Sequence, residues 1–117
     1  MLKVYAYKGC STCRNATKWL TANKIAFQEI PIRETPPSLE ELKDAFAARG
    51  GDVRKFFNTS GQDYRNLRLS EMLAAISDEE ALGLLTKNGN LIKRPFVVSE
   101  KAYLVGFKED EWAKALL

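Results

Sequence analysis

Polar and apolar positions follow two different rhythms in the N-terminal part of the chain. Residues 2–7 alternate between apolar side chains and polar or aromatic ones, which is the pattern of a strand. Residues 11–23 repeat apolar positions at helical spacing, and residues 25–32 again have the composition of a strand, ended by Pro36 and Pro37. A strand, a helix and a strand in so short a segment predict a βαβ unit with two parallel strands, because the helix crosses over to the start of the next strand.

The middle of the chain, residues 38–88, has a helical pattern. Ser38 with Glu41, and Ser77 with Glu80, each have the spacing of a capping box, in which both side chains satisfy N–H groups at a helix start. Each box is followed by apolar residues at helical spacing. We therefore expect two helices that begin at these serines and belong to a helical insertion.

Shorter segments separate these two helices. The first helix is expected to end at Gly50 and Gly51, because glycine commonly follows a helix. Asp52 is expected to cap a short turn, and residues 58–61 have the composition of a loop. Ser70 is expected to open a further short helix.

The C-terminal part of the chain returns to strands. Residues 96–98 and 103–105 are aromatic or aliphatic, and the short segment 99–102 between them predicts an antiparallel hairpin. Residues 108–117 follow as a last helix, with Trp112 on its inward face. The third region therefore has the order strand, strand, helix.

Together these elements predict a single α/β domain over residues 1–117. Its core is a four-stranded mixed sheet built as βαβ and then ββα, with the helical insertion at about residues 38–88. The length of 117 residues fits one domain, because domains cluster at about 100–150 residues.

Composition excludes several classes of functional site. The chain has no histidine, which rules out His-based triads and His metal ligands, and its two cysteines cannot by themselves close a zinc site. The net charge of +3 comes from interspersed signs, unlike the clustered charge of a nucleic-acid site, and no apolar run approaches the length of a membrane span. We therefore expect a cytoplasmic monomer that holds no metal or bound cofactor and contacts neither nucleic acid nor a membrane.

The two cysteines form the motif that carries chemistry. Cys10 and Cys13 have C-x-x-C spacing at the junction between the first strand and the first helix, so their sulfurs lie one helical turn apart. The helix start favours negative charge on Cys10, and Lys8 and Arg14 add positive charge nearby. We therefore expect Cys10 to be the nucleophilic thiolate, and the more buried Cys13 to be the thiol that resolves a mixed disulfide.

Three segments carry a resemblance to a known family: 7–14 (YKGCSTCR), 91–98 (LIKRPFVV) and 104–112 (LVGFKEDEW). On these residues the chain resembles the arsenate reductase-like branch of the thioredoxin superfamily, which includes the Spx and MgsR regulators. The resemblance covers essentially the whole chain. It implies a thioredoxin-like, or glutaredoxin-like, fold interrupted by a helical subdomain.

The fold that this resemblance implies has a cis-proline before its third strand, facing the active cysteine. Pro95 falls at that place, and Arg94 before it is then expected near Cys10, where a guanidinium binds an anionic group. Three arginines of the glutaredoxin-coupled arsenate reductases hold the oxyanion. One of them aligns with Arg94, whereas the other two align with the neutral residues Asn58 and Phe107.

Three functions follow from the motif and the resemblance. The first is a thiol–disulfide oxidoreductase with Cys10 as nucleophile, Cys13 as resolving thiol, and glutathione, glutaredoxin or thioredoxin as electron donor. Its substrate-binding residues are Arg14, Arg94, Pro95 and Lys8. The second is an Spx-like redox-sensing regulator that binds the C-terminal domain of the α chain of RNA polymerase, through a surface that includes the family glycine near Gly50 and Gly51. The third is a glutaredoxin-coupled arsenate reductase.

Overall fold

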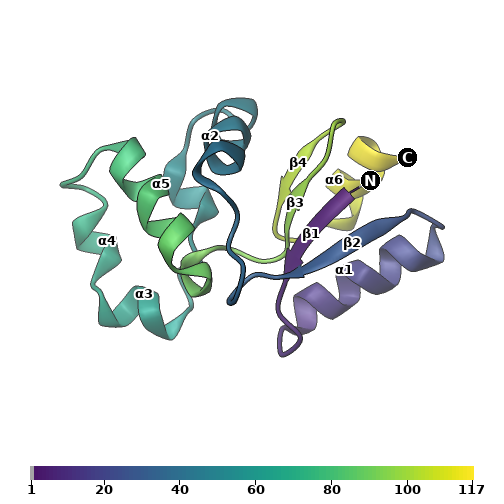
Figure 1. Cartoon of the computed structure of the whole chain (residues 1–117), viewed down its shortest axis with the longest axis horizontal. Coiled ribbons are helices and arrows are strands. Elements are labelled where there is room, and N and C mark those ends of the chain that lie inside the picture. Colours follow the sequence, from purple (N-terminus) through teal and green to yellow (C-terminus); the bar gives the residue numbers. More distant parts are fainter. Residues whose placement is uncertain (1) are drawn as a thin grey trace.

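Four strands form one mixed sheet in the computed structural model, which describes residues 2–117 (Figure 1). The strands and the two helices beside them are β1 (Leu2–Ala6), α1 (Ser11–Ala22), β2 (Phe27–Pro31), β3 (Phe96–Val98), β4 (Tyr103–Val105) and α6 (Glu109–Leu116). The strand order is β2-β1-β3-β4. β1 and β2 are parallel, whereas β1 with β3 and β3 with β4 are antiparallel. The predicted mixed sheet, with βαβ followed by ββα, is therefore confirmed.

The alternation in β1 places its side chains on two covered faces of the sheet. Val4 and Ala6 pack with residues of α1 and α6, including the fully buried Trp112. Tyr5 points to the opposite face and packs with Phe96 and the helices of the insertion. Figure 1 shows α1 and α6 on one side of the sheet and α2 to α5 gathered on the other. The sheet thus separates two apolar clusters, because every side chain along a strand alternates between its faces.

The helical insertion lies between β2 and β3. Its elements are α2 (Leu39–Ala48), η1 (Val53–Phe56), α3 (Gln62–Asn66), α4 (Leu69–Met72), α5 (Asp78–Lys87) and η2 (Gly89–Leu91). Both predicted capping boxes are formed: the Oγ of Ser38 accepts the N–H of Glu41, and the Oγ of Ser77 accepts the N–H of Glu80, each at 3.1 Å. Helices α2 and α5 therefore begin at the predicted serines.

The short helix predicted at Ser70 is present, but it begins one residue earlier and Ser70 does not open it. Ser70 is the second residue of α4, which follows Arg68 in the left-handed backbone region, and the hydroxyl of Ser70 caps nothing. A separate short helix, α3, precedes it. The helices α3 and α4 form because they bury Tyr64 and Leu69 against the rest of the insertion. This burial depends on tertiary contacts, which local capping signals in the sequence do not predict.

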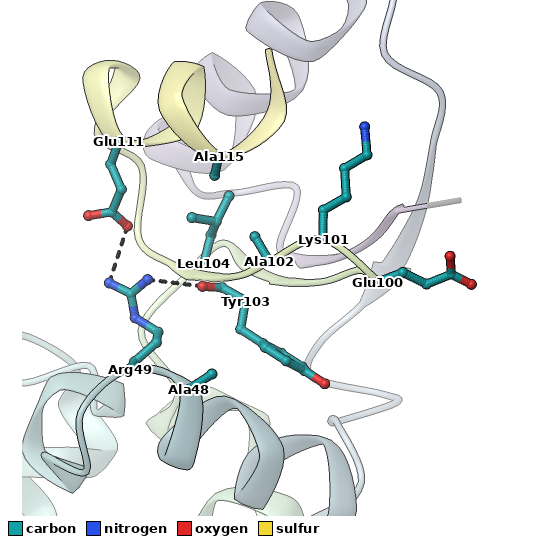
Figure 2. A pocket seen from close by; sticks show the side chains of 9 residues that line it. All are labelled: Ala48, Arg49, Glu100, Lys101, Ala102, Tyr103, Leu104, Glu111 and Ala115. Carbon is teal, nitrogen blue, oxygen red and sulfur yellow. Dashed lines mark hydrogen bonds and ion pairs between the residues drawn. The ribbon is translucent and has the colours of Figure 1, made fainter.

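Two polar links join the insertion to the sheet. Glu41 of α2 accepts hydrogen bonds from Lys3 Nζ at 2.7 Å and from Tyr5 Oη at 2.8 Å, both on β1. Arg49, after α2, donates from Nη1 to the carbonyl oxygen of Tyr103 at 2.9 Å, and its Nη2 lies 3.1 Å from Oε1 of Glu111 (Figure 2). The residues of the second link line a cavity between the end of α2, β4 and α6. These contacts hold the insertion in a defined place relative to the cysteines.

Candidate active site

Cys10 occupies the position just before α1. Its backbone is extended, its N–H donates to the carbonyl oxygen of Tyr7 at 3.0 Å, and its Sγ accepts the N–H of Cys13 at 3.2 Å. The sulfur therefore takes the place of a helix-capping oxygen, satisfying one of the free N–H groups of the first turn. That sulfur therefore lies at the start of α1 with a backbone N–H directed at it.

Cys13 lies one turn into α1 and is nearly fully buried, with 2% of its surface exposed. Burial, followed by the hydrogen bond with Cys10, raises the pKa of the Cys13 thiol to about 12. Both cysteines are free thiols in this structure. The two sulfurs thus differ in environment, since Cys10 is half-buried at the protein surface and Cys13 belongs to the apolar cluster under the sheet.

A pocket of about 290 Å³ opens beside Cys10. Its lining comes from the start of α1, the loop after η1, the segment before β3, and the turn between β4 and α6. The lining residues are Cys10, Thr12, Asn58, Lys93, Arg94, Val105, Gly106, Phe107 and Lys108. The sulfur at the helix start is therefore the one that this pocket makes accessible.

Arg94 shares this pocket with Cys10, and the Arg94–Pro95 bond is cis, as expected. Pro95 is buried at the start of β3, and its carbonyl oxygen accepts the N–H of Gly106 at 2.9 Å. The guanidinium of Arg94 lies 5.3 Å from the ring centroid of Tyr7, within the range of a cation–π contact. Tyr7 thus holds the Arg94 end of this dipeptide and Gly106 holds the Pro95 end.

Asn58 reaches the pocket through a short piece of antiparallel pairing. Phe57 pairs with Ile92, the N–H of Asn58 donates to the carbonyl oxygen of Leu91 at 2.7 Å, and the N–H of Lys93 donates to that of Phe56 at 2.8 Å. This pairing fixes part of the insertion directly against the segment that precedes Pro95. Asn58 and Phe107, the positions where the resemblance led us to expect two family arginines, therefore both line the pocket as neutral side chains.

Lys8 and Arg14 do not line this pocket. Arg14 is exposed, and its Nη1 donates to the carbonyl oxygen of Lys8 at 2.8 Å, which braces the turn before Cys10. Lys8 borders a separate cavity of about 560 Å³ near the end of β2. Of the predicted substrate-binding residues, the structure therefore brings Arg94 to the pocket of Cys10 and places Pro95 directly behind it, while the other two lie outside.

An aromatic cluster supports the far wall of the pocket. The ring of Phe107 stands edge-on to Trp112, with centroids 4.9 Å apart, and Trp19 of α1 packs against both. The Nε1–H of Trp112 donates to the carbonyl oxygen of Gly106 at 3.0 Å.

The sequence analysis assigned no function to three residues that line the pocket, Thr12, Lys93 and Lys108. Thr12 lies inside the cysteine motif and Lys93 directly precedes Arg94, whereas no short-range signal in the sequence points to Lys108.

Residues 2–117 contain no group of three or more cysteine, aspartate or glutamate side chains that is placed to hold a metal ion. Among the same residues, no helix has the length and apolar character that crossing a membrane requires.

Comparison with known proteins places this chain and its fold in a family. The model of the ArsC family matches residues 5–115. The protein YusI of Bacillus subtilis is 49% identical over 111 residues, which cover 95% of this chain and 94% of YusI. The global transcriptional regulator Spx of Enterococcus faecalis is 32% identical over 111 residues, 95% of this chain and 83% of Spx. A crystal structure of a Bacteroides fragilis protein described as related to the ArsC family superposes with a TM-score of 0.92 at 46% identity, covering 97% of this chain and 96% of the other. With a family match over nearly its whole length, the chain belongs to the ArsC family.

Proposed function

We propose that this protein is a thiol–disulfide oxidoreductase in which Cys10 attacks and Cys13 resolves. The observation that carries the proposal is that the two sulfurs differ in their surroundings. Cys10 accepts the N–H of Cys13 and faces a pocket, whereas Cys13 is buried, with its pKa raised to about 12. The thiolate is the reactive form of cysteine, so the accessible sulfur at the helix start is the one suited to attack.

The reaction has two exchange steps. The Cys10 thiolate attacks one sulfur of a substrate disulfide, forming a Cys10–substrate disulfide and releasing the other substrate sulfur as a thiolate, which takes a proton from water. Cys13 then loses its proton and attacks Cys10, forming the Cys10–Cys13 disulfide and releasing the second substrate thiol. The substrate disulfide gains two electrons and the protein dithiol loses two.

The Cys10–Cys13 disulfide must then be reduced by one dithiol or by two monothiols. Two molecules of glutathione, or one molecule of reduced thioredoxin or glutaredoxin, supply the two electrons and become disulfides themselves. Arg94 lies in the pocket as a site for an anionic group of the substrate, and Pro95 behind it orders the strand start. Arg14 and Lys8 act from outside the pocket, as supports of the turn that carries Cys10.

A redox-sensing regulator is the second candidate, and the similarity to Spx favours it. In that case the Cys10–Cys13 state changes the binding of the C-terminal domain of the RNA polymerase α chain, and no substrate turns over. The family glycine of that surface is expected near Gly50 and Gly51, and a Cβ added at Gly50 would meet nothing within 4 Å. Binding of that purified polymerase domain to the reduced and the oxidised protein tests this candidate, and equal binding in the two states would contradict it.

Arsenate reduction is the third candidate, and the lining of the pocket argues against it. Arg94 is in place, but Asn58 and Phe107 supply no charge at the other two arginine positions. A doubly charged oxyanion would find one guanidinium there in place of three, because the other two cations of the lining, Lys93 and Lys108, are lysines at other positions. Arsenate added to the reduced protein with glutathione and glutaredoxin is expected to give negligible turnover.

The first test is equilibration of the purified protein with graded ratios of reduced to oxidised glutathione, followed by mass spectrometry. The wild type is expected to lose two protons reversibly as Cys10 and Cys13 join. Cys13→Ser is expected to accumulate a glutathione adduct on Cys10, and Cys10→Ser to accumulate neither product. Thiols that stay free at every ratio, or an adduct that survives Cys10→Ser, would overturn the proposal.

A further inference from the structure

The pocket beside Cys10 carries a concentration of positive charge that the catalytic steps leave unexplained. Lys93, Arg94 and Lys108 all line it, and none of its nine lining residues is acidic. The ion pairs found within residues 2–117 join Lys3 with Glu41, Lys43 with Glu79, and Arg49 with Glu111. The three cations of the pocket are outside these pairs, so their charge remains available to a ligand.

Each cation is positioned by the fold. The N–H of Lys93 is tied to the carbonyl oxygen of Phe56, and the side chain of Lys93 lies across Gly106, where a Cβ would come within 2.9 Å of Cε. The absence of a side chain at Gly106 is therefore what lets Lys93 extend along the pocket. Lys108 occupies the position just before α6, and Arg94 lies over the ring of Tyr7.

The acidic residues that follow Lys108 in the sequence do not line this pocket. Glu109, Asp110 and Glu111 follow Lys108, but they border a neighbouring surface hollow together with Lys108 and Lys114. The pocket wall on the other side of the cations is the ring of Phe107 and the side chain of Val105. The site thus combines a reactive sulfur, an apolar wall and three cations, which suits a sulfur compound that carries carboxylates.

We propose that Lys93 and Lys108, together with Arg94, select acidic low-molecular-weight disulfides as the partners of Cys10. The inference rests on the proposed function, and it names the substrate class of the same site: a disulfide whose thiol halves bear carboxylates, as in oxidised glutathione. Lys93 and Lys108 are specificity-determining residues that attract and orient the carboxylates. Cys10 forms a disulfide with one half, and the other half leaves as a thiolate that is protonated by water.

The charge acts mainly on the rate of productive encounter. A cleft lined by one sign of charge raises the local concentration of oppositely charged ligands and speeds association by about 10- to 1000-fold at low salt. The effect weakens as salt is added, because the Debye length falls to about 8 Å at physiological ionic strength. Acidic, neutral and basic disulfides should therefore react at different rates that converge at high salt.

The test uses Cys13→Ser, in which Cys10 forms a mixed disulfide that is not resolved. Its second-order rate constant is measured at low salt with oxidised glutathione, bis(2-hydroxyethyl) disulfide and cystamine, by mass spectrometry of the adduct. The expected order is acidic, neutral, basic, with about tenfold between each disulfide and the next. Adding Lys93→Gln and Lys108→Gln is expected to slow the acidic disulfide about tenfold and leave the neutral one within about twofold.

A matched control carries Lys18→Gln and Lys87→Gln, which remove the same charge from exposed lysines outside the pocket. It is expected to react at the same rates as the Cys13→Ser variant.

Inorganic phosphate tests whether the site binds carboxylates or any oxyanion. At equal ionic strength, phosphate is expected to slow the reaction of the acidic disulfide no more than chloride does. Equal rates for the three disulfides, an equal effect of the control lysines, or selective inhibition by phosphate would overturn the inference while leaving Cys10 chemistry intact. No adduct with any disulfide would overturn the proposed function, and the inference with it.

Discussion

The guanidinium of Arg94 lies over the ring of Tyr7, 5.3 Å from its centroid, and the carbonyl oxygen of the same Tyr7 accepts the N–H of Cys10. One residue therefore positions both the cation and the sulfur of the candidate active site. Arg33 lies over the same ring at 4.6 Å, so the ring is a platform for two guanidinium groups. This relationship joins the end of β1 to the segment before β3.

Tyr7→Leu should weaken the placement of Arg94, whereas Tyr7→Phe should preserve it. A cation–π contact contributes about 0.5–1 kcal/mol at exposed sites, so the leucine variant is expected to raise KM for an acidic disulfide by about two- to fivefold. The phenylalanine variant keeps an aromatic face and is expected to stay close to wild type. Steady-state kinetics with oxidised glutathione and with bis(2-hydroxyethyl) disulfide measure this. A comparable loss on the neutral disulfide would show that Tyr7 acts on the sulfur and not through Arg94.

The resolving step should accelerate with pH. Below its pKa, the thiolate fraction of Cys13 rises tenfold for each pH unit, and burial holds that pKa far above neutrality. Release of the second thiol in a single turnover is therefore expected to increase about tenfold per unit between about pH 7 and 9, if proton loss from Cys13 limits it. Rapid-quench mass spectrometry follows the release, and Cys13→Ser should show none at any pH. A plateau near pH 8 would contradict the high pKa.

Glu41→Gln should destabilise the protein in a pH-dependent way. Partial burial acts to raise the pKa of Glu41, but hydrogen bonds from Lys3, the N–H of Ser38 and Tyr5 outweigh it and lower that pKa below its ordinary value. A lowered folded-state pKa contributes stability that is present above the unfolded value of 4.5 and is lost as pH falls through the folded value.

The expected cost of this substitution is about 1 kcal/mol in the free energy of unfolding at pH 7, since Lys3 is partly exposed. The difference from wild type should shrink as the pH is lowered below 4.5. Urea unfolding at pH 7 and at pH 3 measures both values. Glu40→Gln, an exposed neighbour on the same helix turn, is the control and should have little effect at either pH.

Replacement of two glycines of the insertion by alanine should change the stability of the protein in opposite directions. A Cβ at Gly89 would overlap the carbonyl oxygen of Ile32, because η2 packs directly on the segment that follows β2. Gly89→Ala is therefore expected to cost about 3 kcal/mol in stability. Gly83 lies inside α5 with nothing within 4 Å of such an atom, so Gly83→Ala is expected to stabilise the protein by about 0.5–1 kcal/mol. Thermal and urea unfolding compare the two, and a tolerated Gly89→Ala would show that the contact relaxes easily.

Local signals in the sequence anticipated the elements that depend on neighbouring residues. The alternation in residues 2–7, the two capping boxes and the hairpin around residues 99–102 were confirmed, because each depends on hydrogen bonds or side-chain spacing within a few residues. The start of α4 was misplaced at Ser70 and α3 was missed, because these two helices form to bury Tyr64 and Leu69 against distant parts of the chain.

By itself, the sequence determined the cysteine pair and its place in the fold. A C-x-x-C motif between a strand and a helix puts Cys10 next to N–H groups that have no partner within the helix, and this holds for any tertiary surroundings. Only the tertiary structure decided what Cys10 faces. The pairing of residues 56–58 with 91–93 brings Asn58 and Lys93 to the sulfur, and the turn after β4 adds Phe107 and Lys108. These residues meet because sheet pairing and packing close long loops of the chain, and such contacts leave no periodic or short-range mark in the sequence.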